Sequence, residues 1–272
     1  MYGLKDGYDL AFSIGGACAC SQSLRRAGMQ YASFPFDWLV NYPSVTFAAE
    51  QLVNGFGGLL CREKMVCRGP NANNDKDIYQ NEANGLYFLH DFPKGGDFAK
   101  EFQVIDAKYR RRANRLLKLI ERGGDVLLTY VTIPDGERLP DSELVESLEV
   151  ISRRFPRTRF DLLCFSQKNA GFSGVTNPAP HLYRVDFDYQ SKMPGDENVS
   201  DDRMVAKVLK RVVGHVRDYR TSDERKGYGR KRREREYATY KAVNWFQYVR
   251  NKMTWKLFRH FQNQLARRGF KF

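Results

Sequence analysis

Cys18 is the residue whose surroundings in the sequence best suit chemistry. The apolar run 10–14 predicts a buried strand, and Gly15 and Gly16 after it allow a sharp turn because no Cβ obstructs the chain. A helix is predicted from about Cys18 to Leu24, and unpaired N–H groups at a helix N-terminus stabilise a thiolate. An acyl-transfer site needs this arrangement, since nearby N–H groups can bind an oxyanion. The alternative that these residues leave open is a buried structural cysteine.

His90 is the histidine best placed to act as a base. It lies near the end of the apolar run 86–91, which predicts a strand, and Asp91 follows it directly. If the strand continues regularly, Asp91 points to the opposite face from His90. A core or capping histidine is the alternative at this position. His181, at the start of another predicted strand, is the second candidate for the base.

Charged residues beside aromatic ones mark two further segments. Asp37 lies between aromatic residues in the segment 34–38, where a carboxylate needs a hydrogen bond or an opposite charge, because burying it alone is costly. It either takes part in the site or caps the next turn. Arg111 and Arg112 belong to a run of three arginines in a predicted helix. They form a solvated face, or one of them points into the site to bind an anion.

The elements that must position these residues alternate along the chain. Strands are predicted at 10–14, 86–91, 126–133, 160–165 and 181–189, and helices at 44–56, 98–122 and 141–155. This order indicates an α/β sandwich around a mostly parallel sheet with helices on both faces. The stretch 62–84 is polar and rich in turn residues, and we expect it to be an exposed loop.

The positive charge of the chain is concentrated near its C-terminus. The 272 residues carry a net charge of +13. Residues 203–272 contain 21 Lys and Arg against 5 Asp and Glu, a net of +16, whereas the residues before them have 24 against 27, a net of −3. We therefore expect an α/β domain over 1–200 and a basic helical extension over 201–272.

The extension includes a predicted aromatic and basic helix over 237–268. Such a helix packs on the domain, lies on an anionic membrane surface, or binds nucleic acid. Nucleic acid is the least favoured partner, because no reading motif is present.

The cysteines and the N-terminus bear on compartment and cofactors. No secretion signal or long apolar run is present, so we expect a cytoplasmic protein, or one attached peripherally to the inner face of the membrane. Five cysteines are an odd number and indicate reduced thiols rather than a disulfide framework. Their spacing does not match zinc sites, and no nucleotide-binding loop is evident. We therefore expect neither a metal nor a cofactor.

Four short motifs together resemble a bacterial domain family of papain-like cysteine peptidases. They are SIGGAC (13–18), PFDW (35–38), HDF (90–92) and Tyr109 with Arg111 and Arg112, and the resemblance covers roughly residues 8–190. It implies Cys18 as nucleophile and His90 as general base, and it offers a papain-like α+β fold as the alternative architecture. Asp37 is our first candidate for the group that orients His90, with Asp91 as the second. Backbone N–H groups near Gly16, with Ser13, are candidates for the oxyanion hole.

The sequence therefore favours an enzyme, a thiol hydrolase or acyltransferase that forms a thioester. Its substrate would be a small molecule, a peptide or a glycan-linked compound. The alternative is a non-peptidase protein of glycan or polysaccharide biosynthesis, which binds an anionic substrate through residues 110–112 and attaches to the membrane surface by its basic tail.

Overall fold

The chain divides into two compact units, Met1–Tyr219 and Arg220–Phe272. The computed structural model describes residues 4, 7–16, 18–40, 45–72, 74–131, 139–167, 174–187 and 201–220. The helix predicted over 237–268 lies outside the described residues.

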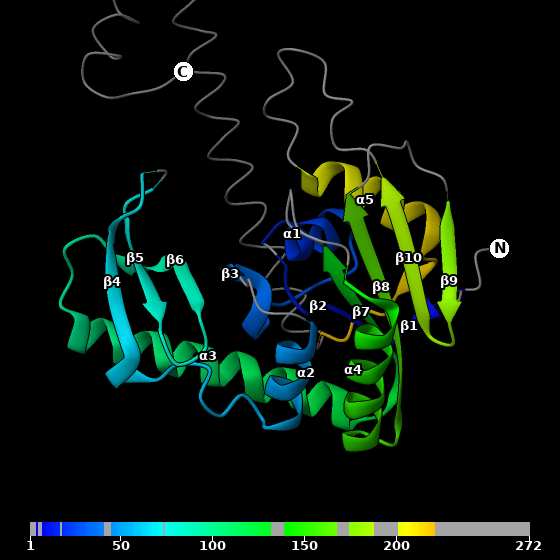
Figure 1. The fold of residues 1–272 in the computed structure, drawn as a ribbon, viewed down its shortest axis with the longest axis horizontal. Helices are drawn as coiled ribbons and strands as arrows, with labels where there is room; N and C mark the ends of the chain where they lie inside the picture. Colours follow the sequence, from blue (N-terminus) through cyan, green and yellow to red (C-terminus); the bar gives the residue numbers. More distant parts are fainter. Residues whose placement is uncertain are drawn as a thin grey trace, which may run out of the picture. The chain divides into compact units, whose positions relative to one another are not determined.

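The first unit is built on a five-stranded sheet (Figure 1). Its strands lie in the order β2 (Leu10–Ser13), β7 (Gly124–Val131), β8 (Thr158–Gln167), β10 (Leu182–Phe187) and β9 (Val175–Ala179). The first four run parallel to one another, and β9 pairs antiparallel with β10 at the edge. The predicted α/β class with a mostly parallel central sheet is confirmed.

Helices cover both faces of this sheet because both faces of its strands are apolar. Leu10 and Phe12 of β2 face one core, and Ala11 faces the other. The first core also contains residues of α2 (Val45–Val53), α3 (Phe98–Glu121) and α4 (Asp141–Arg154). The second contains residues of α1 (Cys18–Ala27) and α5 (Asp201–Val212).

The segment 62–84, which we expected to be an exposed loop, forms two strands of a smaller antiparallel sheet. Its strands lie in the order β3 (Leu39–Val40), β6 (Leu86–Pro93), β5 (Lys76–Asn81) and β4 (Met65–Pro70), and β4 follows the short helix η2 (Arg62–Lys64). The prediction for 62–84 was therefore wrong. The ring of Tyr79 on β5 lies 4.2 Å from that of Phe92 on β6 and 5.2 Å from that of Phe98 on α3. This aromatic packing stabilises strands that look polar in the sequence.

The first compact unit extends beyond the boundary expected at residue 200. Helix α5 packs on α1, and the short strand β11 (His215–Val216) pairs in parallel with β1 (Gly7–Tyr8). Residues 201–219 thus belong with the sheet, because the apolar face of α5 contributes to its second core.

The turn from β2 into α1 depends on Gly16. Its φ is +86°, and a Cβ built there would lie 1.8 Å from the carbonyl oxygen of Val131, at the end of β7. Only glycine allows the turn to approach the neighbouring strand this closely.

We predict that Gly16→Ala destabilises the fold by at least about 3 kcal/mol, because backbone strain adds to a clash with backbone atoms. Gly28 is the matched control: its φ is +77°, and nothing lies within 4 Å of an added Cβ. Gly28→Ala should cost only about 1 kcal/mol. Urea unfolding followed by circular dichroism measures both, and equal losses would contradict the prediction.

Candidate active site

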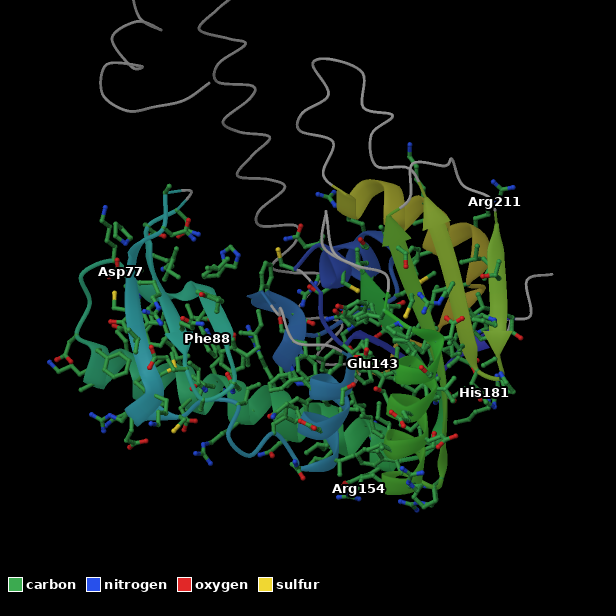
Figure 2. All side chains as sticks on the ribbon, in the orientation of Figure 1. Asp77, Phe88, Glu143, Arg154, His181 and Arg211 are labelled. Atoms are coloured by element: carbon green, nitrogen blue, oxygen red, sulfur yellow. The ribbon has the colours of Figure 1, made fainter. Side chains whose placement is uncertain are left out.

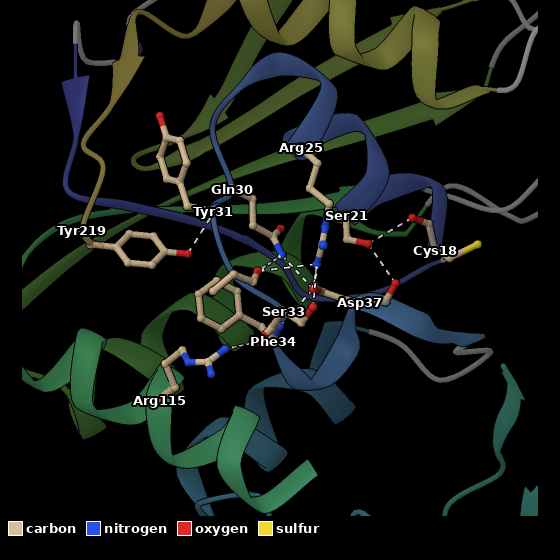
Figure 3. A network of polar contacts seen from close by, with 11 residues as sticks. Cys18, Ser21, Arg25, Gln30, Tyr31, Ser33, Phe34, Asp37, Arg115 and Tyr219 are labelled. Carbon is tan, nitrogen blue, oxygen red and sulfur yellow. Dashed lines mark hydrogen bonds and ion pairs between the residues drawn. The ribbon is translucent and has the colours of Figure 1, made fainter. Parts of the chain in front are cut away.

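Cys18 is the first residue of α1 and is half-buried. The hydroxyl of Ser21, one turn further along α1, lies 3.1 Å from the Cys18 carbonyl oxygen and 2.8 Å from the carbonyl oxygen of Asp37. Ser21 therefore links the start of α1 to the short helix η1 (Pro35–Trp38). In Figure 3 the Cys18 sulfur points away from the Asp37 network.

The other cysteines differ from Cys18 in burial. Cys20 and Cys164 are buried, and burial raises the pKa of the Cys20 thiol to about 11 and that of Cys164 to about 12. These two thiols stay protonated at neutral pH. Cys61 is half-buried, and Cys67 is exposed on β4.

Ser13 is fully buried and supports the turn before Cys18. Its hydroxyl oxygen accepts a hydrogen bond from the N–H of Gly15, at 3.2 Å. The thiol of the nearby Cys20 lies 3.2 Å from the Thr129 hydroxyl. The contacts of Ser13 are therefore those of a residue that shapes the glycine turn.

Asp37 is buried among three donors (Figure 3). Its carboxylate forms an ion pair with Arg25 of α1 and accepts hydrogen bonds from the Gln30 amide, at 2.8 Å, and from the N–H of Phe34, at 2.9 Å. Burial raises the pKa of Asp37, and Arg25 with the two other donors partly offsets this. The carboxylate makes no hydrogen bond to His90, so its contacts are those of an anchor between α1 and η1.

Trp38 connects this anchor to His90. The Arg25 guanidinium lies 5.6 Å from the centre of the Trp38 ring, and the His90 ring meets Trp38 edge-on, with 5.8 Å between ring centres. Contacts thus lead from Cys18 through Ser21 and η1 to His90. No hydrogen bond joins Cys18 to His90.

His90 and Asp91 point to opposite sides of β6. The His90 side chain is exposed, whereas the Asp91 side chain is only 4% exposed and faces α3. There it forms an ion pair with Lys108 and accepts a hydrogen bond from the Tyr109 hydroxyl, at 2.8 Å. Tyr109 is buried, which raises its pKa, and the Asp91 charge raises it further. Asp91 therefore fixes β6 to α3 and does not orient the His90 ring.

The two arginines of α3 have separate environments. Arg111 is exposed, and the Arg112 guanidinium lies 5.2 Å from the centre of the Tyr109 ring. Arg112 thus packs on the residue that holds Asp91. In the described part of the chain, Arg111 makes no hydrogen bond or ion pair with the other candidate residues.

His181 lies between β9 and β10, at the opposite end of the main sheet from Cys18 (Figure 2 labels His181). It precedes β10, whereas Cys18 follows β2, and the two strands run in the same direction. Its Nδ1 lies 2.7 Å from the Asp161 carboxylate, which is buried. His181 is therefore not placed to act on Cys18.

The family model described as "Putative papain-like cysteine peptidase (DUF1796)" matches residues 9–163. This is more than half of the chain and contains Cys18, Asp37, His90 and Tyr109. The chain belongs to this family. Neither a curated protein nor a solved structure matches it.

Among the residues that the family model matches, the structure shows a polar contact to His90 that the sequence did not indicate. Nδ2 of Asn74 lies 3.4 Å from Nδ1 of His90. Asn74 belongs to the asparagine-rich turn before β5, and the only signal in the sequence was this cluster of asparagines.

Metal ligation and membrane crossing have no support in the described residues. They contain no group of three or more His, Cys, Asp or Glu that could hold a metal ion. None of the helices described is both long and apolar enough to cross a membrane.

We predict that Asp37→Ala lowers the free energy of unfolding by about 3 kcal/mol, because it leaves Arg25 and two other donors without their acceptor. Asp37→Asn should lose less, since its amide oxygen still accepts from Phe34. Glu82→Ala, which removes the exposed pair with Arg68, is the control and should cost at most about 1 kcal/mol. Urea denaturation measures all three, and an Asp37→Ala variant as stable as the control would show that Asp37 is not an anchor.

Proposed function

We propose that the protein is a thiol hydrolase or acyltransferase in which Cys18 is the nucleophile and His90 transfers protons. Membership of the papain-like family supports this proposal. The observation that carries it is the position of Cys18: a half-buried thiol at the first residue of α1, directly after the glycine turn against β7. The helix dipole favours a thiolate there, in contrast to the buried Cys20 and Cys164.

The contacts around Trp38 support the assignment of His90. The Trp38 ring touches both His90 and Arg25 of α1, and Ser21 ties η1 to the carbonyl of Cys18. These contacts hold the elements that carry the thiol and the imidazole against one another. His90 is also exposed, as a group that exchanges protons with substrate and water must be.

The proposed reaction uses the Cys18 and His90 side chains, backbone N–H groups of α1, and water or an acceptor hydroxyl. His90 accepts the thiol proton, and the Cys18 thiolate attacks the carbonyl carbon of an ester or amide. The backbone N–H groups of the first turn of α1, after Gly16, stabilise the oxyanion. The intermediate collapses to a thioester as the leaving group takes the proton from His90. Water or an acceptor hydroxyl then loses a proton to His90, attacks the thioester and releases the thiolate.

We predict that Cys18 is the fastest cysteine to react with iodoacetamide. At pH 6 it should be labelled at least about tenfold faster than the exposed Cys67, because only Cys18 has its thiolate stabilised by a helix N-terminus and a histidine. Cys20 and Cys164 should stay unlabelled in the folded protein. Mass spectrometry of a tryptic digest measures all sites in one experiment.

His90→Ala should slow labelling of Cys18 about tenfold at pH 6, because it removes the imidazolium that stabilises the thiolate, and leave labelling of Cys67 unchanged. His181→Ala is the matched control and should change neither rate, since His181 lies at the opposite end of the main sheet from Cys18. An unchanged rate of Cys18 labelling in His90→Ala would refute the thiol mechanism and favour the non-peptidase alternative.

Cys18→Ala should retain the melting temperature of the native protein within a few degrees and lose all turnover of an activated ester. Cys67→Ala serves as its control. Full activity of Cys18→Ala would exclude Cys18 as the nucleophile.

A further inference from the structure

Strand β6 is irregular where it carries His90. Asp77 of β5 pairs with Phe92, and Tyr79 pairs with Phe88. Between these pairs β5 has one residue, Ile78, and β6 has three, 89–91. Strand β6 therefore bulges outward by two residues at His90.

The bulge decides which way His90 points. In a regular strand His90 would share a face with Phe88 and Phe92, because side chains alternate. Both phenylalanines are buried, at 0% and 1% exposure, whereas His90 is exposed (Figure 2 labels Phe88). The extra residues turn the His90 ring out of the core towards Trp38, as bulges do when they re-aim a side chain.

Two asparagine side chains hold the backbone of this bulge. The amide Nδ2 atoms of Asn71 and Asn74 donate to the carbonyl oxygen of Leu89, at 3.0 and 3.3 Å. The oxygen of the Asn74 amide accepts from the N–H of Lys76, at 3.0 Å, which fixes the orientation of that amide. The bulge carbonyl has thus gained two side-chain donors in place of a regular ladder partner.

We propose that Asn71 and Asn74 are positioning residues for His90. By binding the Leu89 carbonyl they maintain the bulge, and the bulge keeps the imidazole against Trp38 and outside the core. The Asn74 amide also faces the ring, with its Nδ2 atom 3.4 Å from Nδ1 of His90. The catalytic meaning of this arrangement rests on the function proposed for His90.

Asn84, in the turn between β5 and β6, supplies a matched control. Its amide nitrogen donates to the carbonyl oxygens of Gly58 and Leu59, at 3.0 and 3.2 Å, and its oxygen accepts from the N–H two residues on, that of Leu86. It therefore makes the same kinds of bond as Asn74, without any contact to His90.

The test compares Asn74→Ala, the double variant Asn71→Ala/Asn74→Ala and Asn84→Ala in the full chain. The ring proton resonances of His90 are followed by NMR, and His90→Gln assigns them among the four histidines. We expect the Trp38 ring current to shift these resonances in the native protein. Asn74→Ala should move them towards their unfolded positions, the double variant further, and Asn84→Ala not at all. Labelling of Cys18 at pH 6 should fall about tenfold in the double variant, because a small displacement of a catalytic group is costly.

Ring resonances of the double variant that coincide with those of the native protein would overturn the proposal, and so would an equal shift in Asn84→Ala. If the resonances move but the rate of Cys18 labelling is unchanged in both His90→Ala and the double variant, the asparagines position His90 and the thiol mechanism is wrong. The two failures are therefore distinguishable.

Discussion

The buried carboxylate of Asp37 is the constraint on which the candidate site depends. A carboxylate without exposure to water must have donors, and Arg25, Gln30 and the N–H of Phe34 supply them. These donors come from α1 and from the loop after it, so satisfying the charge joins α1 to η1. Because Trp38 follows Asp37 directly, the same ion pair places the Trp38 ring beside Arg25, where it also contacts His90.

Asp91 also joins two elements through a buried carboxylate, as Asp37 does. It binds Tyr109 and Lys108 and so fixes β6 to α3, while Arg112 packs on the Tyr109 ring. The four motifs that carry the family resemblance thus form one continuous series of contacts, from α1 through η1 and β6 to α3. Both aspartates in these motifs make the contacts of anchors. Cys18, by contrast, is half-buried at the start of α1, and His90 is exposed on β6.

The parts of the fold that the sequence predicted well are those with strong local periodicity. The strand before Cys18, the long helix α3 and the buried strands of the main sheet each follow from a run or a repeat of apolar residues. The small sheet did not, because β4 and β5 are polar and are stabilised by aromatic stacking with β6 and α3. Residues 201–219 were assigned to the basic tail on charge, although the apolar face of α5 packs beside α1. The net charge of a segment does not show which side of its helix is apolar and buried.

Local sequence patterns establish the residue types that the chemistry needs and the elements that carry them: a thiol after a glycine turn at a helix start, and a histidine near a strand end. Tertiary structure decided what each charged group touches. It paired Asp37 with Arg25 rather than with a histidine, turned Asp91 towards Tyr109, and separated His181 from Cys18 by the length of the sheet. It also brought the turn with Asn71 and Asn74 onto the bulge beside His90. The physical reason is that strand register and bulges depend on packing between segments far apart in the chain, whereas periodicity reports only on neighbours.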